Sequence, residues 1–207
     1  MLSRLSAILR AFPAAASLPN LRATSHFNTM SDNQQGETAT FASGCFWGTE
    51  HIFVKHYGPK TGKGILKTAV GYTGGNEDAS SPSYREVCSG TTNHAEALRL
   101  QFDPEKVSYA ELVEFFYRTH DPTTANRQGG DVGTQYRSII FTHTPEQHQT
   151  AQNVTAEVQA KRFDPKGQKI VTEIVPAGVW YDAEDYHQDY LFKNPEGYQC
   201  PTHRLNW

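Results

Sequence analysis

The sequence predicts an α+β fold, a two-layer sandwich with a ferredoxin-like βαββαβ core, added helices and a long C-terminal tail. The first six periodic segments run strand, helix, strand, strand, helix, strand, which is the order of the split βαβ arrangement. The chain has 207 residues, which is room for one sizeable core. We therefore expect one domain over residues 38–207, in which residues 193–207 form a mobile tail.

The first half of the core is marked by hydrophobic periodicity and by chain breaks. Residues 38–43 are predicted to form a strand and residues 46–57 a helix, before glycines and Pro59 interrupt the pattern. Residues 65–72 are β-prone and predict a second strand. Residues 95–102 alternate with period two, which predicts a third strand.

The second half is marked by helix-start signals. Ser108 and Glu111 have the spacing of a capping box, and apolar residues at helical spacing follow them. A strand is expected over residues 136–142. Thr144 and Gln147 predict a second capping box, with proline at the first helical position.

The end of the chain shows weaker patterns. Residues 170–175 predict a last strand, and Asp182 is expected to cap a short helix that runs through Leu191. The remainder contains two prolines and a glycine and has little regular pattern. It also carries Cys200.

Residues 1–37 stand apart from the rest of the sequence. Three arginines alternate with apolar residues, and no acidic residue occurs before Asp32, which is typical of a transit peptide. An ordinary disordered terminus is the alternative interpretation. Met30 precedes a polar run and is a candidate second start, so we expect a mitochondrial form, a cytoplasmic form, or both.

Composition excludes several classes of function. Lysine and arginine total 19 against 22 acidic residues, so no basic field exists to hold nucleic acid. No apolar stretch reaches the roughly 18 to 20 residues that span a bilayer. Three cysteines without a CxxC pair, and nine histidines without metal-ligand spacing, predict neither a disulfide framework nor a metal site. We expect no bound cofactor.

Cys45 lies between two glycines, after the first predicted strand and at the start of the first predicted helix. A helix N-terminus presents unpaired N–H groups that favour a thiolate, the nucleophilic form. Phe46 and Trp47 follow and are candidate walls for a small apolar group. The alternative is that Cys45 is a small buried hydrophobe.

Glu96 has the same parity as Leu98 and Leu100 in its predicted strand, so its carboxyl group should point to the apolar face. Burial of an unpaired carboxyl raises its pKa and makes it a general acid near neutral pH. The alternative is that Glu96 bends into solvent at the strand's start, or pairs with His94 or an arginine.

Other candidates are individually weaker. Tyr84, Tyr136 and Asp131 are expected at junctions of loops and strands, where phenol and carboxyl groups can converge on a ligand; most tyrosines are instead core or surface residues. Cys200 in the tail is a thiol that could reach Cys45 and restore it after oxidation. Cys88 is interpreted as structural, with a reserve role as the resolving thiol.

Five motifs occur in order: GCFWG at 44–48, GYTGG at 71–75, YREVCSG at 84–90, HAE at 94–96 and GTQYRS at 133–138. With them the chain resembles the peptide methionine sulfoxide reductase A family, from Phe41 nearly to Trp207. The resemblance implies a peptide-methionine (S)-S-oxide reductase, an oxidoreductase that repairs oxidative damage to free or protein-bound methionine.

The resemblance also implies roles for residues at matching positions. Cys45 attacks the sulfoxide sulfur, and Glu96 protonates the departing oxygen. The supporting residues are expected to bind that oxygen (Tyr84, Tyr136), hold the S-methyl group (Phe46, Trp47) and order the site (Asp131).

Recycling is implied in the same way. The sulfenic acid left on Cys45 condenses with the Cys200 thiol, and thioredoxin reduces the disulfide. Many relatives carry two tail cysteines, whereas this tail has one, so we expect a direct Cys45–Cys200 bond. A second departure is Ser81-Pro82-Ser83-Tyr84, where relatives often have Asn-Pro-Thr-Tyr. Thioredoxin and methionine sulfoxide are the expected partners of a monomer.

Two other functions are open on the residues alone. A cysteine hydrolase or acyltransferase would need a histidine base, for which His94 or His187 is available. A thiol redox sensor would signal through the Cys45–Cys200 bond without being recycled by thioredoxin.

Overall fold

The computed structural model describes residues 36–207. The transit-peptide interpretation and the candidate start at Met30 lie outside the described residues. The helices are α1 (Phe46–Tyr57), α2 (Tyr84–Cys88), α3 (Tyr109–Arg118), α4 (Pro145–Val158) and α5 (Tyr190–Lys193). The strands are β1 (Glu37–Ser43), β2 (Ile65–Thr73), β3 (Ala95–Phe102), β4 (Arg127–Gln128), β5 (Asp131–Val132), β6 (Ser138–Thr142), β7 (Glu173–Pro176) and β8 (Trp180–Asp182).

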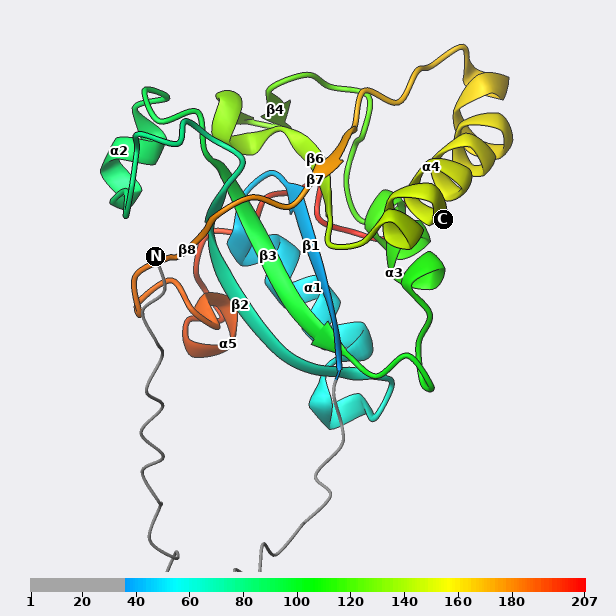
Figure 1. The fold of residues 1–207 in the computed structure, drawn as a ribbon, viewed down its shortest axis with the longest axis horizontal. Coiled ribbons are helices and arrows are strands. Elements are labelled where there is room, and N and C mark those ends of the chain that lie inside the picture. Colours follow the sequence, from blue (N-terminus) through cyan, green and yellow to red (C-terminus); the bar gives the residue numbers. More distant parts are fainter. Residues whose placement is uncertain (1–35) are drawn as a thin grey trace, which may run out of the picture. The chain divides into compact units, whose positions relative to one another are not determined.

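Six strands form one mixed sheet in the order β7-β6-β1-β3-β2-β8 (Figure 1). All neighbours are antiparallel except β6 and β7, which run parallel. The register places Phe41 opposite Leu98 and Tyr72 opposite Glu96. β4 and β5 form a separate two-stranded hairpin.

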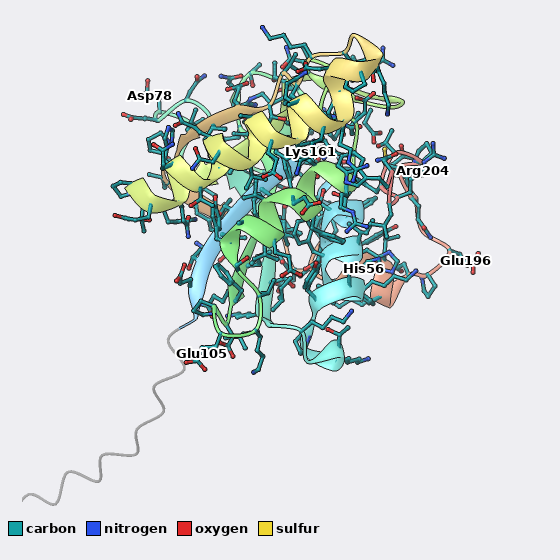
Figure 2. The ribbon with its side chains drawn as sticks, turned by 90° about the vertical axis from the view of Figure 1, so that its right-hand side faces the viewer. His56, Asp78, Glu105, Lys161, Glu196 and Arg204 are labelled. Carbon is teal, nitrogen blue, oxygen red and sulfur yellow. The ribbon has the colours of Figure 1, made fainter. Side chains whose placement is uncertain are left out.

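The helices α1, α3 and α4 lie on one face of this sheet (Figure 2). The main core fills the space between the two layers, where the Phe41 ring stacks on Phe53 and Phe116 at 5.4 and 5.2 Å between centroids. A smaller apolar cluster that includes Ile139 and Phe141 covers part of the other face. The predicted combination of a sheet with packed helices is confirmed.

The alternation predicted for β3 is also confirmed. Glu96, Leu98, Leu100 and Phe102 are all buried on the main-core face, whereas Gln101 is exposed. Parity in the sequence therefore identified the face to which the Glu96 side chain points.

Helix starts follow the predicted signals, although with different partners. Ser108 accepts a hydrogen bond from the Glu111 N–H, but the Glu111 carboxylate accepts one from the Tyr57 hydroxyl instead of completing the box. The complete reciprocal box is formed by Ser83 and Glu86, which start α2. This helix was not predicted: residues 73–82 were expected to form a loop, and no element was expected between that loop and residue 95.

Three later boundaries differ from the prediction. β6 begins at Ser138, because Thr134–Tyr136 forms a 3₁₀ turn, and β7 begins at Glu173. Asp182 does not cap a helix: it ends β8, pairs with Gly71 across the sheet and accepts a hydrogen bond from the Trp180 indole at 2.7 Å.

The short helix α5 begins only after Asp189, whose φ of 54° is a left-handed conformation that breaks a helix. After α5 the chain returns to α3, where the Asn206 N–H donates to the Arg118 carbonyl at 2.9 Å. Within residues 36–207, no helix is both long and apolar enough to cross a membrane.

Candidate active site

Cys45 occupies the N-cap position between β1 and α1. The preceding Gly44 has φ of 96°, and a Cβ there would lie 2.6 Å from the Gln128 Cβ. Both the backbone conformation and the close approach of Gln128 therefore require glycine. The sharp bend turns the thiol toward the amides of the first helical turn.

The protonation state of Cys45 differs from the prediction. Its side chain is 7% exposed, and burial, followed by the charge of Glu96, raises the pKa of the thiol. The amides of Trp47 and Gly48 oppose this shift but do not cancel it. At neutral pH the resting Cys45 is therefore a protonated thiol, and the expected thiolate is corrected because desolvation outweighs the helix N-terminus.

Glu96 supplies a buried acid next to Cys45. It is 1% exposed, and its Oε2 accepts a hydrogen bond from the Phe46 N–H at 3.0 Å. Burial raises the pKa of this carboxyl from 4.5 to about 8, which confirms the predicted direction. Oε1 is buried without a protein partner. A neutral Glu96 thus has one oxygen free to face a ligand.

Two phenols lie close to this carboxyl group. Tyr84 is the first residue of α2, and Tyr136 ends the 3₁₀ turn before β6. Burial raises the pKa of both hydroxyls, and the charge of Glu96 raises each further. Both phenols are therefore neutral hydrogen-bond donors on the Glu96 side of the site.

Cys88 belongs to the same cluster, which its interpretation as a structural residue did not foresee. Burial raises the pKa of its thiol, while hydrogen bonding to the Tyr84 and Tyr136 hydroxyls opposes that shift. Tyr84 and Cys88 are four residues apart in α2, so they lie on one helix face. The capping box at Ser83 was the local signal that would have placed Cys88 there.

The predicted aromatic wall is held by residues from the end of the chain. Trp47 stacks on Tyr190 with 3.7 Å between ring centroids, and its indole N–H donates to His187 Nδ1 at 3.0 Å. The His187 ring also lies 5.0 Å from Phe46 and 4.6 Å from Tyr84. Sequence reasoning missed His187 and Tyr190 as wall residues because it assigned residues 182–191 to an ordinary helix.

Asp131 and Cys200 meet at the β4–β5 hairpin. Asp131 pairs with Gln128 in the hairpin, and the Cys200 Sγ lies 3.6 Å from the Gln128 carbonyl oxygen. The Tyr198 hydroxyl donates a hydrogen bond to Asp131 Oδ1 at 2.9 Å, and Asp131 Oδ2 is buried without a protein partner. Burial raises the pKa of the Cys200 thiol, and Asp131 adds to the shift.

Gln128 lies between the two cysteines that were predicted to react. Its carbonyl oxygen contacts the Cys200 Sγ, and its side chain packs on Gly44, next to Cys45. All three cysteines are free thiols in this structure. The Cys45–Cys200 bond stays a prediction.

The two histidines considered as hydrolase bases are bonded elsewhere. His94 Nδ1 accepts the Gly75 N–H at 3.0 Å, and its Nε2 donates to the Ala79 carbonyl at 3.1 Å. His187 Nδ1 accepts the Trp47 indole N–H, and its Nε2 is buried without a hydrogen-bond partner, 3.8 Å from Glu184 Oε2. Among the described residues, neither ring forms a hydrogen bond with the Cys45 sulfur, so a Cys–His pair has no geometric support.

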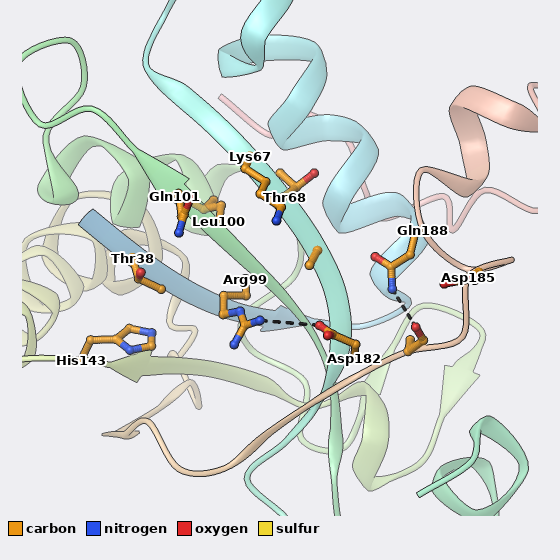
Figure 3. A pocket seen from close by; sticks show the side chains of 12 residues that line it. Thr38, Lys67, Thr68, Arg99, Leu100, Gln101, His143, Asp182, Asp185 and Gln188 are labelled. Atoms are coloured by element: carbon orange, nitrogen blue, oxygen red, sulfur yellow. Dashed lines mark hydrogen bonds and ion pairs between the residues drawn. The ribbon is translucent and has the colours of Figure 1, made fainter. Parts of the chain in front are cut away.

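A separate hollow of about 670 Å³ lies at the sheet face near β8 (Figure 3). Its lining is polar and includes the Arg99–Asp182 ion pair at 3.6 Å and Gln188, which donates to the Ala183 carbonyl at 2.9 Å. None of the predicted site residues lines it. The chemistry-bearing residues gather instead at the β1–α1 junction.

The family model described as peptide methionine sulfoxide reductase matches residues 37–206. A probable peptide methionine sulfoxide reductase of Schizosaccharomyces pombe is 55% identical over 171 residues, which cover 83% of this chain and 97% of the relative.

Solved structures agree with this match. Mxr1 from Saccharomyces cerevisiae in reduced form is similar with a TM-score of 0.77 and 45% identity, covering 85% of this chain and 95% of that chain. The structure of Mxr1 from Saccharomyces cerevisiae in complex with Trx2 is similar with a TM-score of 0.55 and 32% identity, covering 85% of this chain and 94% of that chain.

Proposed function

The chain belongs to the peptide methionine sulfoxide reductase family, and from that premise we propose that it reduces the S epimer of methionine sulfoxide through attack by Cys45 on the sulfoxide sulfur. The observation that carries the proposal is the pairing of a buried thiol at a helix N-terminus with a buried carboxyl whose Oε1 has no protein partner. Each epimer of methionine sulfoxide is reduced by its own enzyme.

The reaction needs a proton on the sulfoxide oxygen and removal of the proton from the Cys45 thiol as its sulfur attacks. Sulfoxide oxygen leaves only when protonated, so the acid must be neutral when the substrate is bound. With a pKa of about 8, Glu96 holds that proton at neutral pH. Neutral Glu96 also removes the negative charge that opposes ionisation of Cys45. A protonated Glu96 therefore supplies the proton for the sulfoxide oxygen and also carries no charge that would oppose the ionisation of Cys45.

The remaining groups orient the substrate. Tyr84 and Tyr136 donate hydrogen bonds to the sulfoxide oxygen, because their raised pKa values keep both phenols protonated. Phe46 and Trp47 enclose the S-methyl group, and His187 fixes the Trp47 indole. Glu96 gives its proton to the sulfoxide oxygen while the proton of the Cys45 thiol passes to the Glu96 carboxylate. The oxygen is transferred to the Cys45 sulfur, which is oxidised to a sulfenic acid, and the sulfoxide is reduced to methionine.

Recycling uses the second thiol at the hairpin. Cys200 condenses with the sulfenic acid to give the Cys45–Cys200 disulfide and water, and thioredoxin then reduces the disulfide by exchange. The contact of Cys200 with Gln128, whose side chain packs on Gly44 next to Cys45, supports this pairing. A neighbouring structure in complex with Trx2, a thioredoxin, supports the external reductant.

We extend the proposal to the whole chain. The order β6-β1-β3-β2, crossed by α1 and α3, supports a ferredoxin-like core in a single catalytic domain over residues 38–207. We propose a monomer that repairs oxidised proteins in mitochondria and, from Met30, in the cytoplasm. The basis for targeting is the arginine-bearing, acid-free composition of the N-terminal region.

The direct test follows both epimers of N-acetyl-methionine sulfoxide by chiral chromatography, with thioredoxin and its reductase as the electron source. The wild type should consume only the S epimer. Cys45→Ser should abolish turnover, because the nucleophile is lost. Cys200→Ser should stop after about one turnover, because the sulfenic acid has no resolving thiol.

Peptide mapping of substrate-treated, unreduced protein identifies the linked pair. A Cys45–Cys88 bond would show that Cys88, and not Cys200, is the resolving thiol. No turnover of either epimer by the reduced wild type would overturn the reductase proposal. Acylation of Cys45 by an ester would favour the hydrolase, and oxidation without recycling by thioredoxin would favour the sensor.

A further inference from the structure

His203, near the end of the chain, is bonded to the junction that carries Cys45. Its Nε2 lies 2.8 Å from the Ser43 carbonyl oxygen and 3.4 Å from the Thr49 hydroxyl. A carbonyl oxygen only accepts, so Nε2 must carry a proton. In the neutral ring Nδ1 is then a bare acceptor, and this atom is buried without a partner.

The side of the ring that carries Nδ1 packs against Gly48. A Cβ on Gly48 would lie 2.0 Å from His203 Nδ1 and 2.8 Å from its Cγ, which is closer than atoms can approach. Gly48 is the third residue of α1, where a glycine is less stable than an alanine. The His203 ring gives a physical reason for the missing side chain.

The same residue is linked to Cys200. The His203 N–H donates to the Cys200 carbonyl at 3.1 Å, which closes a tight turn between them. Ser43, which accepts from the ring, is two residues before Cys45. One hydrogen bond therefore connects a position three residues after Cys200 to a position two residues before Cys45.

We propose that His203 is a positioning residue for the resolving step, and that Gly48 is small so that its ring can dock. This inference rests on the proposed reductase function. In that step the Cys200 thiol attacks the sulfenic sulfur of Cys45: an S–S bond forms, the S–O bond breaks, and the hydroxyl leaves as water with the thiol proton. The Cys200 sulfur is oxidised and the Cys45 sulfur is reduced.

The physical advantage is effective concentration. A thiol on a tethered but undocked segment samples many positions, whereas a docked one stays near its target. Without the His203 bond, the segment would still be held by Tyr198 on Asp131, by Cys200 on Gln128 and by Asn206 on Arg118, but the turn from Cys200 to His203 would lose its own attachment to the Cys45 junction. The chemical step at Cys45 does not need the tail thiol, so only disulfide formation should slow.

The test is a single turnover of the full-length reduced protein with excess methionine S-sulfoxide and no thioredoxin. Methionine release is measured by quenched flow, and disulfide formation by the loss of free thiols. Dimedone labelling detects the sulfenic acid on Cys45. The wild type should release one methionine and then lose the Cys200 thiol.

His203→Ala should release methionine within twofold of the wild-type rate but form the disulfide at least about tenfold more slowly, with dimedone-labelled Cys45 accumulating. His203→Gln keeps an amide N–H that can donate to the Ser43 carbonyl and should recover most of the rate. Arg204→Ala, an exposed neighbour in the same segment, is the matched control and should behave as the wild type.

A double-mutant cycle tests the packing on Gly48. Gly48→Ala should lower the melting temperature and slow disulfide formation in the wild type, because the new Cβ displaces the ring. In the His203→Ala background the same change should raise the melting temperature, because alanine then only improves the helix. This reversal of sign is specific to a ring docked on Gly48.

The outcomes separate the two proposals. If the wild type releases no methionine, the reductase function fails and the inference falls with it. If methionine is released but His203→Ala forms the disulfide within twofold of the wild-type rate, or slows both steps equally, the inference alone is overturned. An equal effect of Gly48→Ala in both backgrounds also overturns it.

If His203→Ala does not fold, two other variants decide. Slow disulfide formation in Gly48→Ala together with normal rates in His203→Gln supports the proposal, and a normal rate of disulfide formation in Gly48→Ala overturns it.

Discussion

At the scale of single residues, Glu96 determines whether the site can donate a proton at neutral pH. The shift of its pKa from 4.5 to about 8 corresponds to about 5 kcal/mol between the two protonation states. That cost arises from burial, because the one backbone hydrogen bond from Phe46 to Oε2 offsets only part of the desolvation and Oε1 has no protein partner. A carboxyl held neutral in this way can give a proton at neutral pH, which an exposed glutamate cannot do.

The rate of the first turnover should therefore fall as the pH rises above about 8, because Glu96 then loses the proton that the sulfoxide oxygen needs. Glu96→Gln should lower this rate by about 10² to 10⁴ and remove the decline near pH 8. Quenched-flow measurement of methionine release between pH 6 and 10 tests both points. A wild-type rate that rises steadily through pH 9 would mean that thiol ionisation, not the acid, limits the reaction.

At the scale of secondary-structure elements, the Glu50 side chain connects α1 with β2 and with the residue that precedes α5. It lies on α1 and is 1% exposed; its Oε1 accepts the Thr68 hydroxyl of β2 at 3.0 Å, and its Oε2 accepts the Asp189 N–H at 2.8 Å. Asp189 precedes Tyr190, which stacks on Trp47. Burial, followed by the charge of Asp189, raises the pKa of Glu50 to about 7, and Lys193 acts in the opposite direction. The Glu50 carboxyl therefore fixes the start of α5, and with it Tyr190, which stacks on Trp47.

Stability should reflect this raised pKa. Between pH 5 and 7 the folded state binds the Glu50 proton more tightly than the unfolded state, so stability is lost as the pH rises through about 7. From pH 5 to pH 8 this loss amounts to about 2 to 3 kcal/mol in the wild type. Glu50→Gln should not show it.

Urea unfolding at the two pH values measures the difference. The exposed Glu105→Gln is the control and should keep the wild-type dependence on pH. An unchanged dependence in Glu50→Gln would assign the effect to other groups.

The site is assembled across the whole molecule from segments far apart in sequence. Cys45 comes from the β1–α1 junction, Glu96 from β3, Asp131 from the hairpin and Cys200 from the returning C-terminal segment. The sheet places β1 beside β3, which brings the Phe46 N–H within 3.0 Å of Glu96. All proposed site residues, and the buried core within the described residues 36–207, lie between residues 39 and 207.

A protein that begins at Met30 should therefore keep its activity. We expect kcat/KM for the S epimer within twofold of the full chain, and a melting temperature within about 2 °C, which corresponds to less than about 1 kcal/mol for a protein of this size. Side-by-side assays of the two forms provide the measurement. A loss of more than fivefold in kcat/KM would assign a part of the active enzyme to residues 1–29.

Short-range patterns in the sequence were sufficient for much of the fold and part of the site. Parity in β3 placed Glu96 on the core face and predicted its raised pKa, and both outcomes are confirmed. Helix starts at Ser108 and Thr144 were also predictable, because capping is a contact between residues three apart.

Only the tertiary structure decided the protonation of Cys45, the place of Cys88 and the partners of Trp47. The thiol's pKa depends on burial and on Glu96, which is fifty-one residues away in the chain. Trp47 is held by His187 and Tyr190, which lie more than a hundred residues later. Sequence patterns report local conformation, whereas desolvation and long-range contacts depend on which distant segments pack together.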